Sequence, residues 1–230
     1  MAIRISQLHK QIDKKIASNV IKLATPVVLS NISRTMMSFV DVMMVGHLGS
    51  KALAATGMGS MVVWTMISFS IGLRTATQTV SSRRLGQQNF AECGTALRNG
   101  ILLSFCYGVP VSLLGYMSSG WIAQLLLNET QVSTLARDYI SIGFLGVLFS
   151  SVCFVFQGFY TGVEKTKIHM KVTVASNLLN IYLNAGFIYG SCGVQAFFND
   201  LKIPFLGSLW GVFNFPALGV KGAAIATVIA

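Results

Sequence analysis

Long apolar runs separated by short polar stretches form the main pattern of this chain. Five runs have the length of a membrane-crossing helix, which takes about 20 residues, and a sixth begins near residue 218. The predicted helices cover residues 21–48, 53–80, 97–117, 139–160, 168–189 and, as an incomplete sixth helix, 218–230. We therefore expect an all-α integral membrane protein that crosses the bilayer several times.

Two segments lie outside the apolar runs. Residues 1–20 form a basic amphipathic lead, which is followed by a long apolar run rather than by the short core and small-residue site of a cleaved signal peptide. Residues 190–217 form a long and mildly apolar connection. We expect this connection on the outer side, as a surface loop in preference to an interfacial or re-entrant segment.

Composition strengthens the membrane prediction. The 230 residues are 53% hydrophobic and only 10% charged, whereas soluble domains carry about 25% charged residues.

The net charge of +10 would indicate nucleic acid binding in a soluble protein. Here eleven basic residues fall in the N-terminal segment and in alternate connections, and only four fall in the other connections. This asymmetry predicts a cytoplasmic N-terminus, and anionic membrane lipid accounts for the charge without nucleic acid.

Three ionisable side chains lie inside apolar runs, where such groups usually mark a pathway or a pairing. They are Arg34, Asp41 and Arg74. Arg34 and Asp41 are seven residues apart, so they share one face of a helix. Two interpretations stand: a structural pair in which the charges neutralise one another, or a polar and partly hydrated cavity lined by that face.

The fifth predicted helix carries a row of amides on one face, at Asn177, Asn180 and Asn184. Amides at every turn suit a cavity or a helix contact better than lipid. Their oxygens can coordinate Na⁺ and their N–H groups can donate to a carboxylate, although hydrogen bonding between helices without any ligand is the alternative. Weaker candidates for lining the same cavity are Gln78, Gln157 and Tyr139.

Enzyme signatures are missing from the sequence. It contains no HExxH, GxSxG or Walker A pattern, and its four cysteines have no metal-ligand spacing. We therefore expect no enzymatic activity and no cofactor. Without an ATP-binding loop, any transport depends on an ion gradient or runs downhill.

Several segments resemble the multidrug and toxic compound extrusion (MATE) transporters. The opening "LATPVVLSNISRTMMSFVDVMMVGHLGSKALAATG" holds Pro26, Asp41 and the Val45–Gly49 motif in the order typical of that family. The run "LLNIYLNAGFIYG", with Asn180 and Asn184, is similar to the family's fifth-helix signature. The resemblance extends in order over nearly the whole chain.

This resemblance implies twelve helices in two six-helix lobes, of which the chain is the N-terminal lobe without the C-terminal lobe. It implies secondary active multidrug efflux of small organic compounds by antiport against Na⁺ or H⁺, in a bacterial inner membrane. We expect Asp41, Asn180 and Asn184 to couple the ion, with Asp41 and Asn180 as the ligands if the ion is Na⁺. The expected substrate cavity residues are Arg34, Gln78, Gln157, Asn177 and Tyr139.

Two alternatives stay open. A lipid-linked oligosaccharide flippase of the same superfamily would favour more cationic cavity residues, and Arg34 and Arg74 support that reading. An inactive half-transporter fragment is the other alternative, because half a cavity has no second wall against which to alternate.

Overall fold

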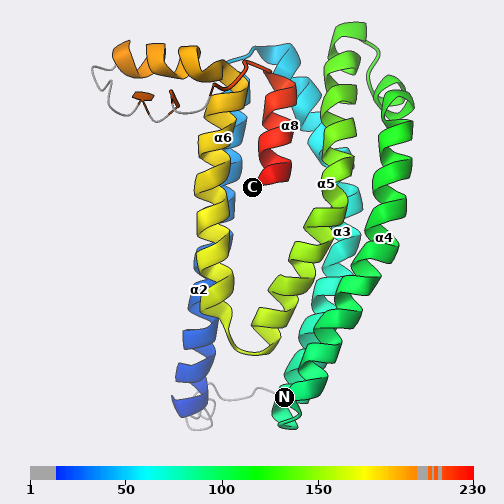
Figure 1. Cartoon of the computed structure of the whole chain (residues 1–230), viewed down its shortest axis with the longest axis vertical. Coiled ribbons are helices and arrows are strands. Elements are labelled where there is room, and N and C mark those ends of the chain that lie inside the picture. The colour runs from blue at the N-terminus through cyan, green and yellow to red at the C-terminus, as the bar shows by residue number, and fades with distance from the viewer. Residues whose placement is uncertain (1–13, 201–206, 209, 212–213) are drawn as a thin grey trace, which may run out of the picture.

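The computed structural model describes residues 14–200, 207–208, 210–211 and 214–230. Long helices dominate this part of the chain and stand side by side (Figure 1). Their bounds are α2 (Lys14–Gly46), α3 (Ser50–Gly86), α4 (Phe90–Leu126), α5 (Thr130–Gly162), α6 (Thr166–Asp200) and α8 (Val220–Ile229). The all-α prediction is confirmed.

The helices extend beyond their predicted ends. The helix predicted over 97–117 begins at Phe90 and ends at Leu126, and its start is capped by Asn89, whose side chain accepts a hydrogen bond from the Glu92 N–H at 3.3 Å. Hydropathy detects only the apolar middle of a helix, whereas backbone hydrogen bonding continues through the polar ends. The predicted lead, 1–20, lies outside the described residues up to position 13, and from Lys14 it belongs to α2.

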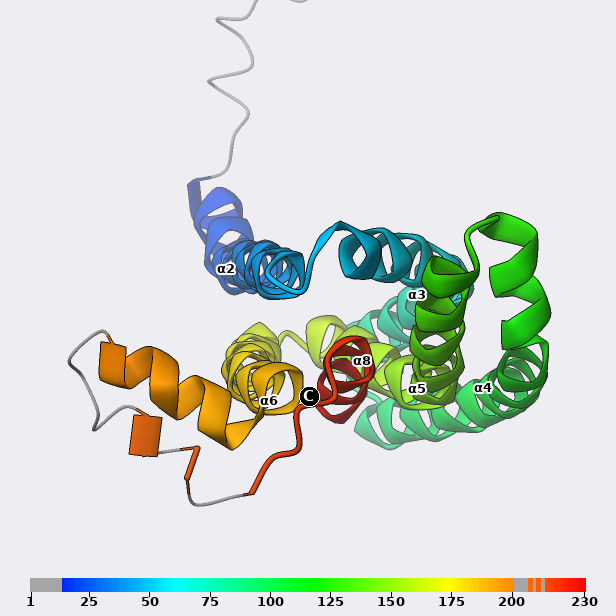
Figure 2. The same cartoon turned by 90° about the horizontal axis from the view of Figure 1, so that it is seen from above.

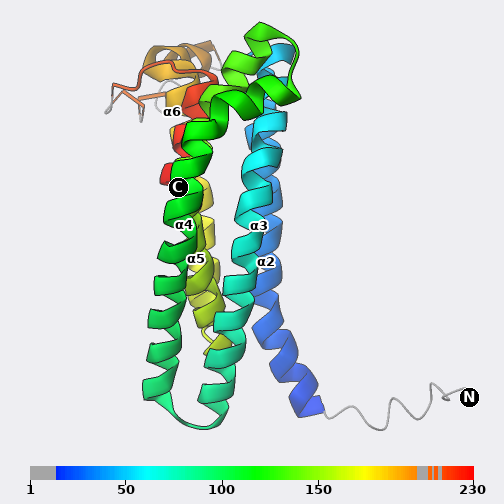
Figure 3. The same ribbon diagram turned by 90° about the vertical axis from the view of Figure 1, so that its right-hand side faces the viewer.

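Two groups of helices make up the fold. In one group α5 packs against both α3 and α4, and in the other α2 packs against α6. The short α8 lies between α5 and α6 and contacts both (Figure 2). Helix α2 has few contacts with α3, and its N-terminal part leans away from α3 (Figure 3).

Small residues allow α4 and α5 to approach closely. The buried positions of α4 include Gly100, Ser104, Gly108 and Gly115, which lie four or seven residues apart on one face. A Cβ atom on Gly115 would overlap the ring of Phe144 on α5. In lipid, where apolar burial does not drive helices together, close packing of this kind holds them.

Four of the described helices, α2 to α5, are long and apolar enough to cross a membrane. Large apolar side chains cover their outer surfaces, among them Phe69 and Met117, which are 65% and 82% exposed. Such a surface suits lipid contact. The fifth predicted span, 168–189, falls within α6, which is not among those four because its polar stripe lowers the hydropathy. Together these helices form an integral, multi-pass membrane protein.

The connection predicted over 190–217 contains a helix instead of only a surface loop. Helix α6 continues to Asp200 through a kink at Gly190, where φ is 75° and ψ is 160°, and the part after the kink runs sideways, away from the upright helices (Figure 1). The returning chain pairs with the kink: Leu218 donates its N–H to the Phe187 carbonyl at 2.8 Å. The loop prediction was therefore wrong for residues 190–200, because a glycine kink changes the helix direction without ending the helix.

Replacing Gly190 with valine is expected to lower the stability of the protein by about 1–3 kcal/mol, because its backbone angles lie in a region that essentially only glycine occupies. A Cβ atom there would also press on Ala217, at 3.1 Å. The measurement is thermal unfolding of the purified protein in detergent. Gly193→Val is the matched control, since a Cβ atom at Gly193 meets only Tyr189 at an ordinary 3.4 Å. Equal melting temperatures for the two variants would contradict the strain.

Candidate functional site

A carboxylate and two amides from α2 and α6 form a hydrogen-bonded chain. The Asn184 Nδ2 group donates to Asp41 Oδ1 at 2.6 Å and to Asn180 Oδ1 at 2.7 Å. Asn180 is 0% exposed and Asn184 is 1% exposed. The predicted proximity of Asp41 to the amide face is therefore present in the fold.

The chain forms because α2 and α6 run parallel and in register. Asn177 donates to the Ser33 hydroxyl at 2.7 Å across a separation of 144 residues. The contact of Asn184 with Asp41 spans 143 residues, and a third contact, from the Tyr189 hydroxyl to a carbonyl of α2, spans 145 residues at 2.7 Å. A nearly constant offset means that each turn of α6 faces the corresponding turn of α2.

The amides of this chain retain unused hydrogen-bonding capacity. Asn184 Oδ1 and Asn180 Nδ2 are buried and have no hydrogen-bond partner. A buried polar atom without a partner costs about 1–3 kcal/mol. The carboxylate and the two amide oxygens are hard oxygen atoms of the kind that bind Na⁺, whereas the Asn180 Nδ2 group can only donate a hydrogen bond. The oxygen atoms of Asp41, Asn180 and Asn184 therefore have the chemistry of cation ligands.

Tyr139 brings α5 to the same site. Its ring packs against Gly59 of α3, where a Cβ atom would come within 2.8 Å of the ring. Tyr139 also packs against a buried cluster that includes Val45 of α2 and Ile188 of α6. These two residues lie one helical turn beyond Asp41 and Asn184.

The other candidate residues lie away from Asp41. Within the described part of the chain, Arg34 makes no ion pair. The structural pairing of Arg34 with Asp41 is therefore absent. The backbone at Gln78 contacts Gly162 at the far end of α5, and Gln157, half-buried nearby on α5, has an Oε1 atom without a partner.

Sequence reasoning missed the lower part of the polar stripe on α6. Buried polar residues continue along that face from the predicted amides to His169, whose Nδ1 lies 3.3 Å from the Thr173 hydroxyl. The signal was available, because all five positions repeat at three or four residues. The complete stripe consists of His169, Thr173, Asn177, Asn180 and Asn184.

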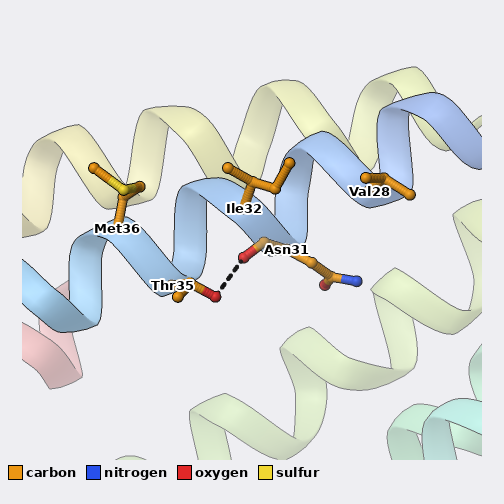
Figure 4. Close-up of a pocket in the computed structure, with 5 residues that line it drawn as sticks. All are labelled: Val28, Asn31, Ile32, Thr35 and Met36. Carbon is orange, nitrogen blue, oxygen red and sulfur yellow. Dashed lines mark hydrogen bonds between the residues drawn. The ribbon is translucent and has the colours of Figure 1, made fainter.

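A shallow hollow lies on the surface of α2 itself (Figure 4). Two of its residues are polar, and the Thr35 hydroxyl donates to the Asn31 carbonyl at 3.1 Å. Apolar side chains form the rest of the hollow. Its lining is Val28, Asn31, Ile32, Thr35 and Met36. The hollow does not include Asp41, so it is separate from the hydrogen-bonded chain.

Replacing Asn177 with valine is expected to lower stability by only about 0.6 kcal/mol, the average value for a hydrogen bond between membrane helices. The reason is that Asn177 bonds Ser33 and not Asp41. The measurement is thermal unfolding together with transport activity, which should be largely retained. Asn31→Val, at an exposed position of α2, serves as the control. Loss of transport without loss of stability would show that Asn177 does more than join the two helices.

The segment that carries this site matches a known protein family. A family model described as MatE matches residues 26–185, well over half of the chain and the whole of the segment from Asp41 to Asn184. The chain belongs to the MatE family. The resemblance to MATE transporters is thereby confirmed, and with it the assignment of the chain to the N-terminal lobe of that fold.

Similar proteins are multidrug resistance proteins by name. The chain is 27% identical over 226 residues to a probable multidrug resistance protein NorM of Thermotoga maritima, covering 96% of this chain and 43% of the relative. It is 27% identical over 216 residues to the multidrug resistance protein NorM of Vibrio cholerae, covering 94% and 42%. The chain thus spans less than half the length of these relatives.

Solved structures show the same fold. A structure described as the outward-facing conformation of a multidrug resistance MATE family transporter matches with a TM-score of 0.75 and 22% identity, covering 92% of this chain and 41% of that one. A MOP superfamily transporter from Pyrococcus furiosus, described as having a binding pocket of reverse polarity, matches with the same values. At this identity the likeness supports the MATE fold only.

Proposed function

We propose that this chain is the N-terminal half of a secondary active multidrug transporter that exports small organic compounds by antiport against Na⁺ or H⁺. The observation that carries the proposal is the buried chain of Asp41, Asn184 and Asn180, in a family whose similar members are named multidrug resistance proteins. An ionisable group inside membrane-crossing helices is by default a functional group.

The proposed mechanism is thermodynamic linkage at Asp41. A proton on the carboxylate, or Na⁺ held by Asp41 with the amide oxygens of Asn180 and Asn184, removes a buried negative charge. The packing of α2 and α6 against α3–α5 then has a different free energy, because Asp41 lies one helical turn from the cluster of Val45 and Ile188 against which Tyr139 packs. An ion that binds one packing better than the other shifts the population toward it.

The distribution of charge supports a cytoplasmic N-terminus in a bacterial inner membrane. Two of the four basic residues in the connections predicted to face outward form ion pairs with acidic residues. Lys51 lies 2.5 Å from Glu129, and Lys221 lies 3.2 Å from Asp138. Pairing reduces the net positive charge on that side. The remaining excess of Lys and Arg lies on the other side, as cytoplasmic loops require.

A second candidate function is transport of a lipid-linked oligosaccharide. The observation that favours it is that Arg34 and Arg74, half-buried on α2 and α3, make no ion pair within the described residues, because a phosphate-linked sugar would suit cationic side chains. The two candidates differ in substrate. A transport assay with a lipid-linked sugar and with cationic dyes distinguishes them.

The test of the first candidate is transport into everted membrane vesicles that contain the complete gene product, because eversion turns export from the cell into uptake by the vesicle. We expect accumulation of ethidium when a Na⁺ or proton gradient is imposed, and its loss when a protonophore or a Na⁺ ionophore removes that gradient. Vesicles from cells with the empty vector are the control. Movement of the lipid-linked sugar without any movement of dye would replace the first candidate with the second.

A further inference from the structure

Aromatic side chains from both sides of the kink in α6 form one continuous cluster. The Trp210 ring of the returning chain stacks on Tyr182, with ring centroids 4.9 Å apart, and on Phe198, with centroids 5.7 Å apart. Phe215 meets Tyr182 and Phe187 edge to face, with centroids 5.8 Å and 5.1 Å apart. This aromatic cluster therefore joins the returning chain and the sideways part of α6 to the upright part of the helix.

Trp210 lies deeper than the kink, along the upright part of α6. Its indole Nε1 donates a hydrogen bond to the Tyr182 carbonyl at 2.8 Å. Tyr182 precedes the kink by about two helical turns, or ~12 Å at ~1.5 Å per residue. The kink itself lies level with the end of α2, because the Tyr189 hydroxyl donates to the carbonyl of Met44, in the last turn of α2, at 2.7 Å. The indole therefore lies inside the level at which a membrane-crossing helix ends.

The aromatic cluster lies on the outside of the group of upright helices. Helix α6 packs against α2 and α8, whereas its part after the kink runs sideways, away from them (Figure 1 and Figure 2). Every ring of the cluster is only half-buried in the described part of the chain, and the neighbouring Phe197 is 58% exposed. Apolar surface is therefore exposed beside α6, close to the level of the helix ends.

The connection that carries this cluster lacks the charges of a loop in water. Its charged residues are Asp200 and Lys202, whose charges cancel. The backbone at its base is paired internally, since the Phe215 N–H donates to the Ser191 hydroxyl at 2.8 Å and the Ser191 N–H donates to the Phe215 carbonyl at 3.2 Å. Paired backbone groups tolerate a medium that is poor in water, and Trp and Tyr are enriched where membrane meets water.

We infer that the aromatic cluster is a membrane anchor, which lies at the boundary between the headgroups and the acyl chains of the adjacent leaflet and has phospholipid as its partner. Trp210 sets the depth, with its apolar ring toward the acyl chains and its N–H bonded to α6. The anchor fixes the height of the upright part of α6, which carries Asn180 and Asn184, relative to the bilayer. This inference does not depend on what the protein transports.

The test measures the depth of Trp210 in the bilayer by fluorescence quenching. All other tryptophans of the complete gene product are replaced with phenylalanine, among them Trp64 and Trp121, which are exposed on α3 and α4. The protein is placed in vesicles of phosphatidylcholine brominated either near the headgroup or near the end of the acyl chains. We expect the shallow bromines to cause the larger loss of Trp210 fluorescence, and aqueous iodide to cause little loss. An unchanged melting temperature shows that this variant is folded.

Two control variants, each with Trp210→Phe, calibrate the quenchers. Leu103→Trp places the indole on an exposed position in the middle of α4 and should respond most to the deep bromines. Gln87→Trp places it on the exposed turn after α3 and should respond to iodide. Quenching of Trp210 by iodide alone, or most strongly by the deep bromines, overturns the inference. Quenching by neither bromine nor iodide means that protein covers Trp210, from the rest of the gene product or a second copy, and overturns the assignment to lipid.

Discussion

Asp41→Asn is expected to abolish gradient-driven efflux, reducing it to the level of cells without the protein. Asparagine keeps the size of the side chain and can still accept a hydrogen bond from Asn184, which lies 2.6 Å from Asp41. It cannot take up a proton or neutralise a cation. Because linkage requires an ion to bind the two packings with different free energies, the variant should bind drug but should not couple its movement to the gradient.

The measurement is ethidium efflux in everted vesicles under an imposed gradient, with the protein level determined in the same vesicles. Glu92→Gln is the matched control, since Glu92 is exposed and pairs with Arg84 at 2.8 Å on the surface. Full efflux by Asp41→Asn would remove Asp41 from the coupling mechanism. Normal dye binding by this variant would show that the drug site is still formed.

Gly158→Val is expected to prevent the accumulation of folded protein. Any Cβ atom at this position would overlap the carbonyl oxygen of Arg74, which is part of a helix backbone and cannot rotate away. Overpacking of a close contact typically costs about 1–3 kcal/mol, and sometimes more. Here α3 and α5 would have to separate along their length.

The measurement for Gly158→Val is the amount of monodisperse protein recovered by size-exclusion chromatography after mild detergent extraction. Gly94→Val is the control, because a Cβ atom at Gly94 meets no atom within 4 Å. We expect normal recovery for this control. Equal recovery of both valine variants would mean that α3 and α5 do not pack as closely as the structure has them.

The amide row illustrates what periodicity can predict. Three asparagines at helical spacing had to share a face, and that face had to avoid lipid. The structure turns it toward α2, where Asn177 meets Ser33 and Asn184 meets Asp41. The same spacing continues to His169, so the whole polar stripe of α6 could have been predicted from the sequence without knowledge of its contact with α2.

Arg34 illustrates what periodicity cannot predict. It shares a face with Asp41, and this made an ion pair between them a reasonable interpretation. Within the described residues Arg34 makes no ion pair, and Asp41 instead accepts a hydrogen bond from Asn184. Sequence spacing places two residues on one helix, but it carries no information about which other helix approaches each of them.

The helical class, the membrane-crossing runs, the family resemblance and the polar residues of the spans could be predicted without a structure. Each of these follows from local properties: the length of an apolar run, the period of a helix, and the cost of polar groups in lipid. The contact of Asn184 with Asp41 and the turn of α6 at Gly190 became known only from the fold. These features depend on register and crossing between distant helices, which close contacts at small residues such as Gly158 establish.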